Sequence, residues 1–457
     1  MKCCRLKLFT VMKLWISSNM GKFIIAYFIF AIGFGSLSIA QEQKEDVVPY
    51  NLKAALKSVL NNHKTILATK SDIEAAKLRL KQSRGGYFPS LDVTANYGHE
   101  NIIKYGPGNN TQLMARDATA KITQTITDFG LTKSTVETSR LSLKQTRATE
   151  TQIKNDILLR AISAYLRIIQ SRESVRFARQ SVANIKKQTE LEDAAVTAGG
   201  GLTSDVLQAK TQLAGAQARL IQFEGVLATS RHEFEYVFNS FPDNLNSLVL
   251  LKSVFDKLPK SLEEAEEITM KNNPSLIAAR ITEDIGKEAI NTAKSSLFPT
   301  VKGIVSHSEK QDFGGVVGFK RETSAKLDFT YPLNLSLSEF AGKDAAIESY
   351  LATSTRIRDQ EDMIKQMLRT TWDGLITAQQ NAQFLTNQAR ISGEFLELAR
   401  QERQAGNRTL LDVLGGETAL INAQADAIAA KIEVLINSYT LLSLMGGLSV
   451  ESIEFVE

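Results

Sequence analysis

The chain has 457 residues, of which 54 are basic and 50 acidic, so its formal net charge is +4. The basic excess lies in residues 1–40, which hold five Lys or Arg residues and no acid, so the rest carries 49 basic against 50 acidic residues. The net charge therefore excludes a protein that binds nucleic acid through a basic surface.

Residues 1–40 have the three parts of a secretory signal peptide. A basic stretch ends at Lys22, an apolar run covers residues 23–34, and small residues stand at Ser38 and Ala40. The alternative is a membrane anchor, but the apolar run is short for a span. We predict a signal peptide that is cleaved after Ala40.

The two cysteines, Cys3 and Cys4, both precede the predicted cleavage point. The exported chain then has no thiol for a disulfide or a thiolate metal site. After residue 40, no uninterrupted apolar run approaches the roughly 20 residues that a membrane helix needs. We therefore expect an exported protein that either stays soluble in the periplasm or enters a membrane as β-strands.

Enzyme chemistry has no clear signature in the sequence. No nucleophile elbow or phosphate loop follows a predicted strand, and the histidines share no metal-ligand spacing. The histidines are His63, His99, His232 and His307. We expect no catalytic activity, no cofactor and no metal.

The exported part of the chain is an internal duplication. Residues 62–89 align without a gap on residues 272–299, and both segments end in Phe-Pro. Self-similarity at such a spacing indicates a repeated structural unit. We predict two repeats, residues 41–245 and 246–457.

Each repeat is predicted as helix, strand, loop, strand, long helix, turn and helix. The first helix is expected over Leu52–Arg84, before Gly85-Gly86 and Phe88-Pro89. Beyond it the hydrophobic period changes from 3.6 to 2, which predicts strands. The four predicted strands lie near 90–98, 117–127, 300–308 and 322–331.

The predicted strands have one apolar and one polar face, although the strand after Pro299 alternates less cleanly because Ile304 lies on the other face. This pattern is typical either of a half-buried soluble sheet or of strands between lipid and water. Four strands cannot close a barrel, and an open sheet edge cannot lie in lipid. In the second case, several protomers must contribute strands to one barrel.

Two long helices are predicted over residues 131–195 and 337–403, each about 100 Å long at 1.5 Å per residue. Apolar residues recur in steps of three and four on the first of them and on the helices that return after each, as in coiled coils. A returning helix follows each, so we predict two helical hairpins. Their tips are the turns Gly199-Gly200-Gly201 and Gly406-Asn407.

This order of elements resembles the TolC family of outer-membrane efflux and secretion channels. The motifs that carry the resemblance are the doubled Phe-Pro, Asp128-Phe129-Gly130 and the segment 406–414. The resemblance implies an α-helical barrel in the periplasm joined to a transmembrane β-barrel in the outer membrane. It also implies a homotrimer with four strands per protomer and a shared 12-stranded barrel.

The resemblance further implies a passive exit duct in a tripartite export system. Its partners would be outer-membrane lipid, an inner-membrane transporter and a periplasmic adaptor, or membrane fusion protein, at the hairpin tips. The run Ser83–Asp92 resembles ducts of type I secretion, which favours protein export over multidrug efflux. A periplasmic coiled-coil scaffold is the alternative from another class.

At the tips the resemblance implies a polar gate. Asp205 and Arg408 match a latch between hairpins, and Asp412 matches a ring of carboxylates in the pore. Arg403 stands where the family has a latch tyrosine, and Gly415 where it has a second acid. The alternative is that Asp205 and Asp412 only stabilise helix N-termini.

Overall fold

The computed structural model describes residues 50–106, 110–200, 202–242, 244–332, 334 and 336–455. The predicted signal peptide and Gly201 lie outside the described residues. The longer elements are α1 Leu52–Asn62, α2 Lys64–Arg84, β1 Ser90–Ile102, β2 Thr111–Thr127, α3 Leu131–Thr197, α4 Thr203–Phe238, α5 Leu262–Asn272, α6 Pro274–Ser295, β3 Thr300–Gln311, β4 Phe319–Thr330, α7 Ser338–Gln404 and α8 Leu410–Leu444.

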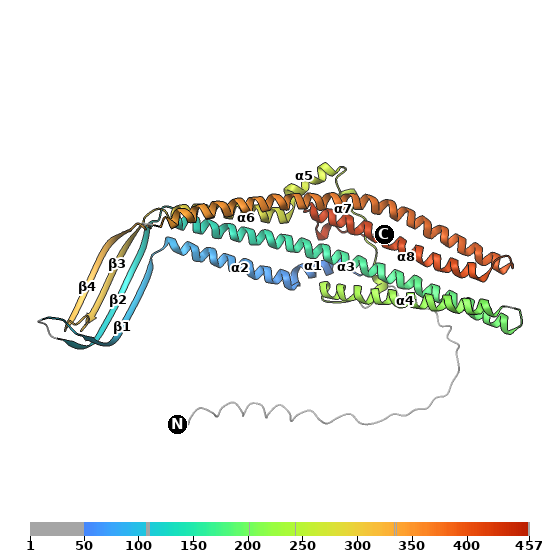
Figure 1. The fold of residues 1–457 in the computed structure, drawn as a ribbon, viewed down its shortest axis with the longest axis horizontal. Coiled ribbons are helices and arrows are strands. Elements are labelled where there is room, and N and C mark those ends of the chain that lie inside the picture. The colour runs from blue at the N-terminus through green and yellow to red at the C-terminus, as the bar shows by residue number, and fades with distance from the viewer. Residues whose placement is uncertain are drawn as a thin grey trace, which may run out of the picture. The chain divides into compact units, whose positions relative to one another are not determined.

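The element order is the same in both halves of the chain. Two helices lead into two strands, a helix of 67 residues follows, and a helix of 36 or 35 residues returns. Within residues 50–455, the strands lie at one end of the long helices and the α3–α4 and α7–α8 turns at the other (Figure 1). The predicted duplication of helix, strand pair and helical hairpin is confirmed.

The single first helix expected over residues 52–84 is wrong, because it breaks at His63. This residue is extended, with φ −62° and ψ 131°, and its ring accepts a hydrogen bond from the Thr65 amide. The second repeat breaks at Asn273, whose side chain accepts from the amides of Ser275 and Leu276. There Pro274 marks the break in the sequence, whereas no proline marks it at His63.

The four strands form one antiparallel sheet in the order β1-β2-β3-β4. The central pair, β2 and β3, joins the two repeats, with a bulge between Thr125 and Thr127. Strands β1 and β4 form the two edges of the sheet. Each edge presents backbone N–H and C=O groups that no strand of the described chain pairs.

The apolar face of the sheet is exposed rather than packed on the helices. Leu91 pairs with Ile122, which pairs with Val305, so apolar side chains align across the strands. Exposed fractions of 64% at Leu91, 74% at Leu327 and 67% at Phe329 mean that no core covers this face. The sequence also allowed a half-buried soluble sheet, but the exposed apolar face does not fit that alternative.

The predicted heptad stripes form the seams of the hairpins. Ala161, Ile168 and Ala178 of α3 are fully buried, and Val413 and Ala423 of α8 are 1% exposed. By length and composition α8 could cross a membrane, although no uninterrupted apolar run was expected there. Half of its most apolar window is buried inside the protein, as in the core helix of a hairpin.

The largest apolar core lies midway along the helices, where the linker between the repeats crosses them. The Tyr165 hydroxyl donates to the Val249 carbonyl at 2.7 Å, and the Tyr439 hydroxyl donates to the Lys252 carbonyl at 3.3 Å. The linker also pairs with the C-terminal segment through Leu251 and Phe455. Linker and C-terminal segment therefore form one belt on the helices.

We predict that Gly446→Ala destabilises the fold. Gly446 ends α8 with φ +70°, and a Cβ there would lie 2.4 Å from the Asn272 carbonyl oxygen. Strain and backbone overlap together should cost more than about 2 kcal/mol. The loss of stability is measured by thermal unfolding, followed through the circular dichroism signal of the helices. The control Gly225→Ala lies within α4 with open space at its Cβ and should be neutral or stabilising.

Candidate functional site

The two hairpin tips have the same backbone structure. Gly199 and Gly406 are left-handed, with φ of 83° and 79°. The amide after each glycine bonds back to the preceding helix, from Gly200 to the Ala195 carbonyl and from Asn407 to the Glu402 carbonyl, both at 2.9 Å. This Schellman-type cap requires a residue without a Cβ penalty, so the glycines fix the tight return of each hairpin.

Asp205 lies in the first turn of α4 and is partly exposed. It accepts a hydrogen bond from the Ser204 hydroxyl at 3.4 Å. It also borders a hollow of about 310 Å³ between the two tips. The hollow is lined by Leu202, Asp205, Gln208, Thr409, Leu410, Leu411 and Leu414.

Arg408 binds within its own hairpin. Its Nε donates to Glu402 at 2.8 Å, and its guanidinium lies 5.1 Å from the centre of the Phe395 ring. The ion pairs found among the described residues of one chain do not join Arg408 to Asp205. The latch between these two residues therefore stays a prediction, which only contacts between protomers could satisfy.

Arg403 joins the two hairpins inside one chain. Its Nη2 on α7 donates to a Glu192 carboxylate oxygen on α3 at 2.9 Å, and the Glu192 side chain is 11% exposed. Sequence reasoning missed Glu192. The signal was present, because Ile185, Thr189 and Glu192 continue the heptad stripe of α3, where a charge needs a partner.

A second buried carboxylate, Glu417 of α8, lies deeper between the hairpins. It is 3% exposed, forms an ion pair with Arg400 of α7 and accepts a hydrogen bond from Asn184 of α3 at 3.4 Å. At the corresponding positions of the first repeat, Asp193 and Lys210 form an exposed pair at 3.2 Å with the charges exchanged. Burial of the second pair thus comes from its contact with α3.

Asp412 is exposed in the first turn of α8. Its amide donates to the hydroxyl of Thr409, which caps the helix, at 3.3 Å. A carboxylate at this position also suits the helix dipole. The pore role of Asp412 needs three chains and stays a prediction.

Polar and apolar contacts hold the tips of the two hairpins together. Among the residues that the structure describes, no group of three or more His, Cys, Asp or Glu side chains could hold a metal ion. Ile185, Ala209, Leu410 and Leu414 form a buried cluster that joins the first hairpin to α8. Within one chain the two hairpins therefore pack as a unit.

Comparisons with known proteins agree with this geometry. The family model described as outer membrane efflux protein matches residues 55–235 and 267–447, one segment in each repeat. TolC of Escherichia coli is 22% identical over 430 residues, covering 91% of this chain and 84% of that protein. The proteases secretion protein PrtF of Dickeya chrysanthemi is 21% identical, covering 81% of this chain and 83% of its own length.

The fold also matches solved structures. The CmeC outer membrane channel of Campylobacter jejuni has a TM-score of 0.78 at 13% identity, covering 93% of this chain and 94% of that one. At this identity the similarity shows the fold.

We predict that Glu192→Gln lowers stability. The change leaves Arg403 without its carboxylate in a largely buried site and should cost about 1–3 kcal/mol. Thermal unfolding measures it. The adjacent Asp193→Asn is the control, because its pair with Lys210 is more than half exposed and should contribute little. Equal losses in both variants would show that the Glu192 bond is not a restraint.

Proposed function

The chain belongs to the outer membrane efflux protein family, and from this premise we propose that three copies form an exit duct for an export system. The family consists of channel proteins of the outer membrane that extend into the periplasm, and neither family nor fold is that of a catalyst. Its members work with adaptors and inner-membrane pumps. The duct would conduct cargo passively between such partners and the exterior.

The exposed apolar face of the sheet is the single observation that most supports the proposal. Side chains such as Leu91 and Leu327 would lie against lipid, whereas Asp92 and Lys121 on the other face would line water. A closed barrel would also satisfy the edge groups of β1 and β4.

The arrangement of edges supports a ring of protomers. Strand β1 and strand β4 run in opposite directions at the two edges of the sheet, so β4 of one protomer could pair antiparallel with β1 of the next. Such head-to-tail contacts close into a ring. Three copies with four strands each would give the 12-stranded barrel that the resemblance implies.

For the cargo, we favour protein export by a type I system. The run Ser83–Asp92 resembles such ducts, and the relative PrtF is described as a proteases secretion protein. Efflux of small molecules is the second candidate, which the family description favours. Crosslinking at the hairpin tips distinguishes the two kinds of cargo. A transporter ATPase should be captured if the duct exports protein, and a proton-driven pump if it exports small molecules.

Carbonate extraction separates the duct from a periplasmic scaffold. We expect the protein to stay in the outer-membrane pellet after washing, because barrel strands are embedded in lipid. A soluble periplasmic protein, washed in parallel, should be released completely. Release of this protein into the wash would contradict the duct.

Opening of the gate gives a further prediction. If Asp205 and Arg408 of neighbouring protomers form the latch, Asp205→Asn and Arg408→Ala should each raise single-channel conductance in planar bilayers. The bond is partly exposed, so its loss should cost only about 1 kcal/mol, and the trimer should persist. Asp193→Asn is the control. Unchanged conductance in both variants would contradict the latch and leave Asp205 as a residue that stabilises the N-terminus of α4.

A further inference from the structure

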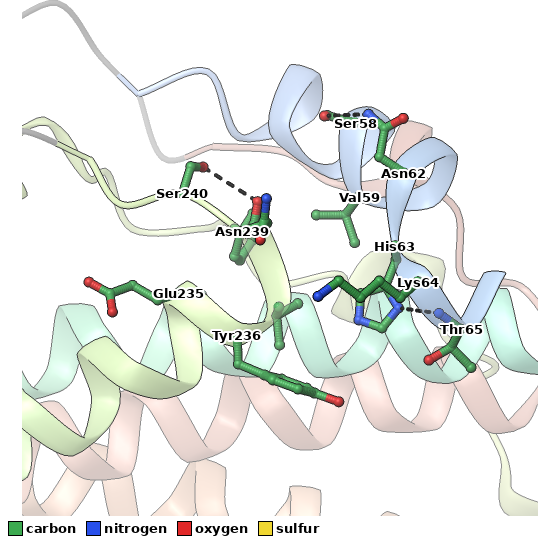
Figure 2. A pocket seen from close by; sticks show the side chains of 12 residues that line it. Ser58, Val59, Asn62, His63, Lys64, Thr65, Glu235, Tyr236, Asn239 and Ser240 are labelled. Atoms are coloured by element: carbon green, nitrogen blue, oxygen red, sulfur yellow. Dashed lines mark hydrogen bonds between the residues drawn. The ribbon is translucent and has the colours of Figure 1, made fainter. Parts of the chain in front are cut away.

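A hollow of about 430 Å³ lies where α2 follows α1 and where α4 ends (Figure 2). Figure 2 shows His63 and Lys64 on one side of it and Tyr236 on the other. The lining residues are Ser58, Val59, Asn62, His63, Lys64, Thr65, Glu235, Tyr236, Val237, Phe238, Asn239 and Ser240. All of them come from α1, α2, α4 and their connections, and none from a 67-residue helix.

The lining of the hollow holds one cation, Lys64. Burial and then the charges of Arg160 and Lys64 lower the pKa of His63, which keeps the imidazole neutral at pH 7. The one carboxylate in the lining, Glu235, is bound by Arg231 at 2.9 Å. Within this lining, the ammonium of Lys64 therefore faces no carboxylate that another cation does not already hold.

A second hollow, of about 390 Å³, lies where α6 begins and α8 ends, and the long helix α3 forms one of its walls. Residues of α1 and of the C-terminal segment also line it. Pro274 and Gly446 line it at the positions that correspond to Lys64 and Asn239. Its α3 wall is made by Thr151, Lys154, Asn155 and Leu158. Asn155 also anchors the end of α8, donating to the Ser443 hydroxyl at 2.8 Å.

The first hollow lacks such a wall because of how the repeats are placed. Helix α3 packs along α2 and α4 of its own repeat and along α6 and α8 of the next. The counterpart of α3 in the second repeat, α7, packs along α6 and α8 of its own repeat. The opposite side of α7 has no third repeat to pack against within the described chain. In a ring of protomers, that side of α7 meets α2 and α4 of the neighbour, as α3 meets α6 and α8.

We propose that α7 of the adjacent protomer closes the first hollow and that its Asp362 binds Lys64 there. The inference rests on the ring assembly proposed above. Asp362 of α7 is the counterpart of Asn155 of α3, because the two equivalent long helices are offset by 207 residues. By the same offset, Ser443 is the counterpart of Tyr236. Where Asn155 presents an amide to the second hollow, Asp362 would present a carboxylate to Lys64 in the first.

The state of Asp362 within one chain fits this role. Its side chain is 78% exposed, and its ion pair among the described residues is with Lys365 of its own helix, at 3.5 Å. A surface ion pair of this kind contributes little to the stability of the fold. Asp362 can therefore exchange this contact for Lys64 without loss, and the new bond would be better shielded from solvent.

Disulfide crosslinking of the full chain tests the contact directly. With Cys3 and Cys4 changed to serine, Tyr236→Cys combined with Asp362→Cys should yield disulfide-linked oligomers in outer membranes, roughly ten-fold more than the control pair, because a disulfide requires close Cα atoms. The control combines Tyr236→Cys with Glu394→Cys, whose counterpart on α3, Lys187, is exposed. Equal yields from the two pairs would overturn the proposal.

Charge reversal tests the chemistry. Lys64→Glu and Asp362→Lys should each lower the temperature at which the oligomer dissociates in detergent, and the double reversal should recover most of the loss. Lys64 is the first residue of α2, where Glu suits the helix dipole, so a loss cannot come from the helix itself. The control Glu394→Lys should leave the temperature unchanged.

The outcomes separate this proposal from the duct. A stable trimer with no crosslink between positions 236 and 362, or with no recovery in the double reversal, overturns the contact and leaves the duct standing. A wild-type protein that is monomeric in mild detergent overturns the ring, and the contact with it.

Discussion

The structure depends on backbone hydrogen bonds that one chain cannot make. The edges β1 and β4 present unpaired N–H and C=O groups, and the sheet exposes apolar side chains such as Leu91 and Leu327. Water can hydrogen-bond the unpaired edge groups but penalises the exposed apolar side chains. Lipid accepts the apolar side chains but penalises the unpaired edge groups. Closure of several sheets into one barrel satisfies both. In the proposed duct, the oligomer thus follows from the properties of the sheet itself.

The helical part follows the same logic through the duplication. Each repeat supplies a hairpin with an apolar seam, and α3 lies between the two repeats as the element that both contact. Where the seams carry charge, Glu192 forms an ion pair with Arg403 of the other hairpin. Glu417 pairs with Arg400 of its own hairpin and accepts a hydrogen bond from Asn184 of the other. These contacts hold the hairpins of one chain together, so motion at the tips must break buried ion pairs or occur between protomers.

Sequence reasoning found what periodicity encodes: the duplication, the strand pairs, the long helices and the glycine tips. It missed the break at His63, because a side-chain cap without a proline leaves no strong local mark. It also missed Glu192, although this residue continues the heptad stripe of α3. It missed Glu417 because the burial of that residue depends on how α3 packs against α8 rather than on its own helix. The roles of Asp205, Arg408 and Asp412 depend on neighbouring chains, and one chain does not contain those contacts.

Hydrogen exchange of the protein in lipid vesicles tests the central claim most directly. If the edges pair between protomers, amides in β1 and β4 should exchange as slowly as those of the inner strands β2 and β3, because every strand is then hydrogen-bonded on both sides. Fast exchange confined to β1 and β4, beside slow exchange in β2 and β3, would show open edges and contradict the shared barrel.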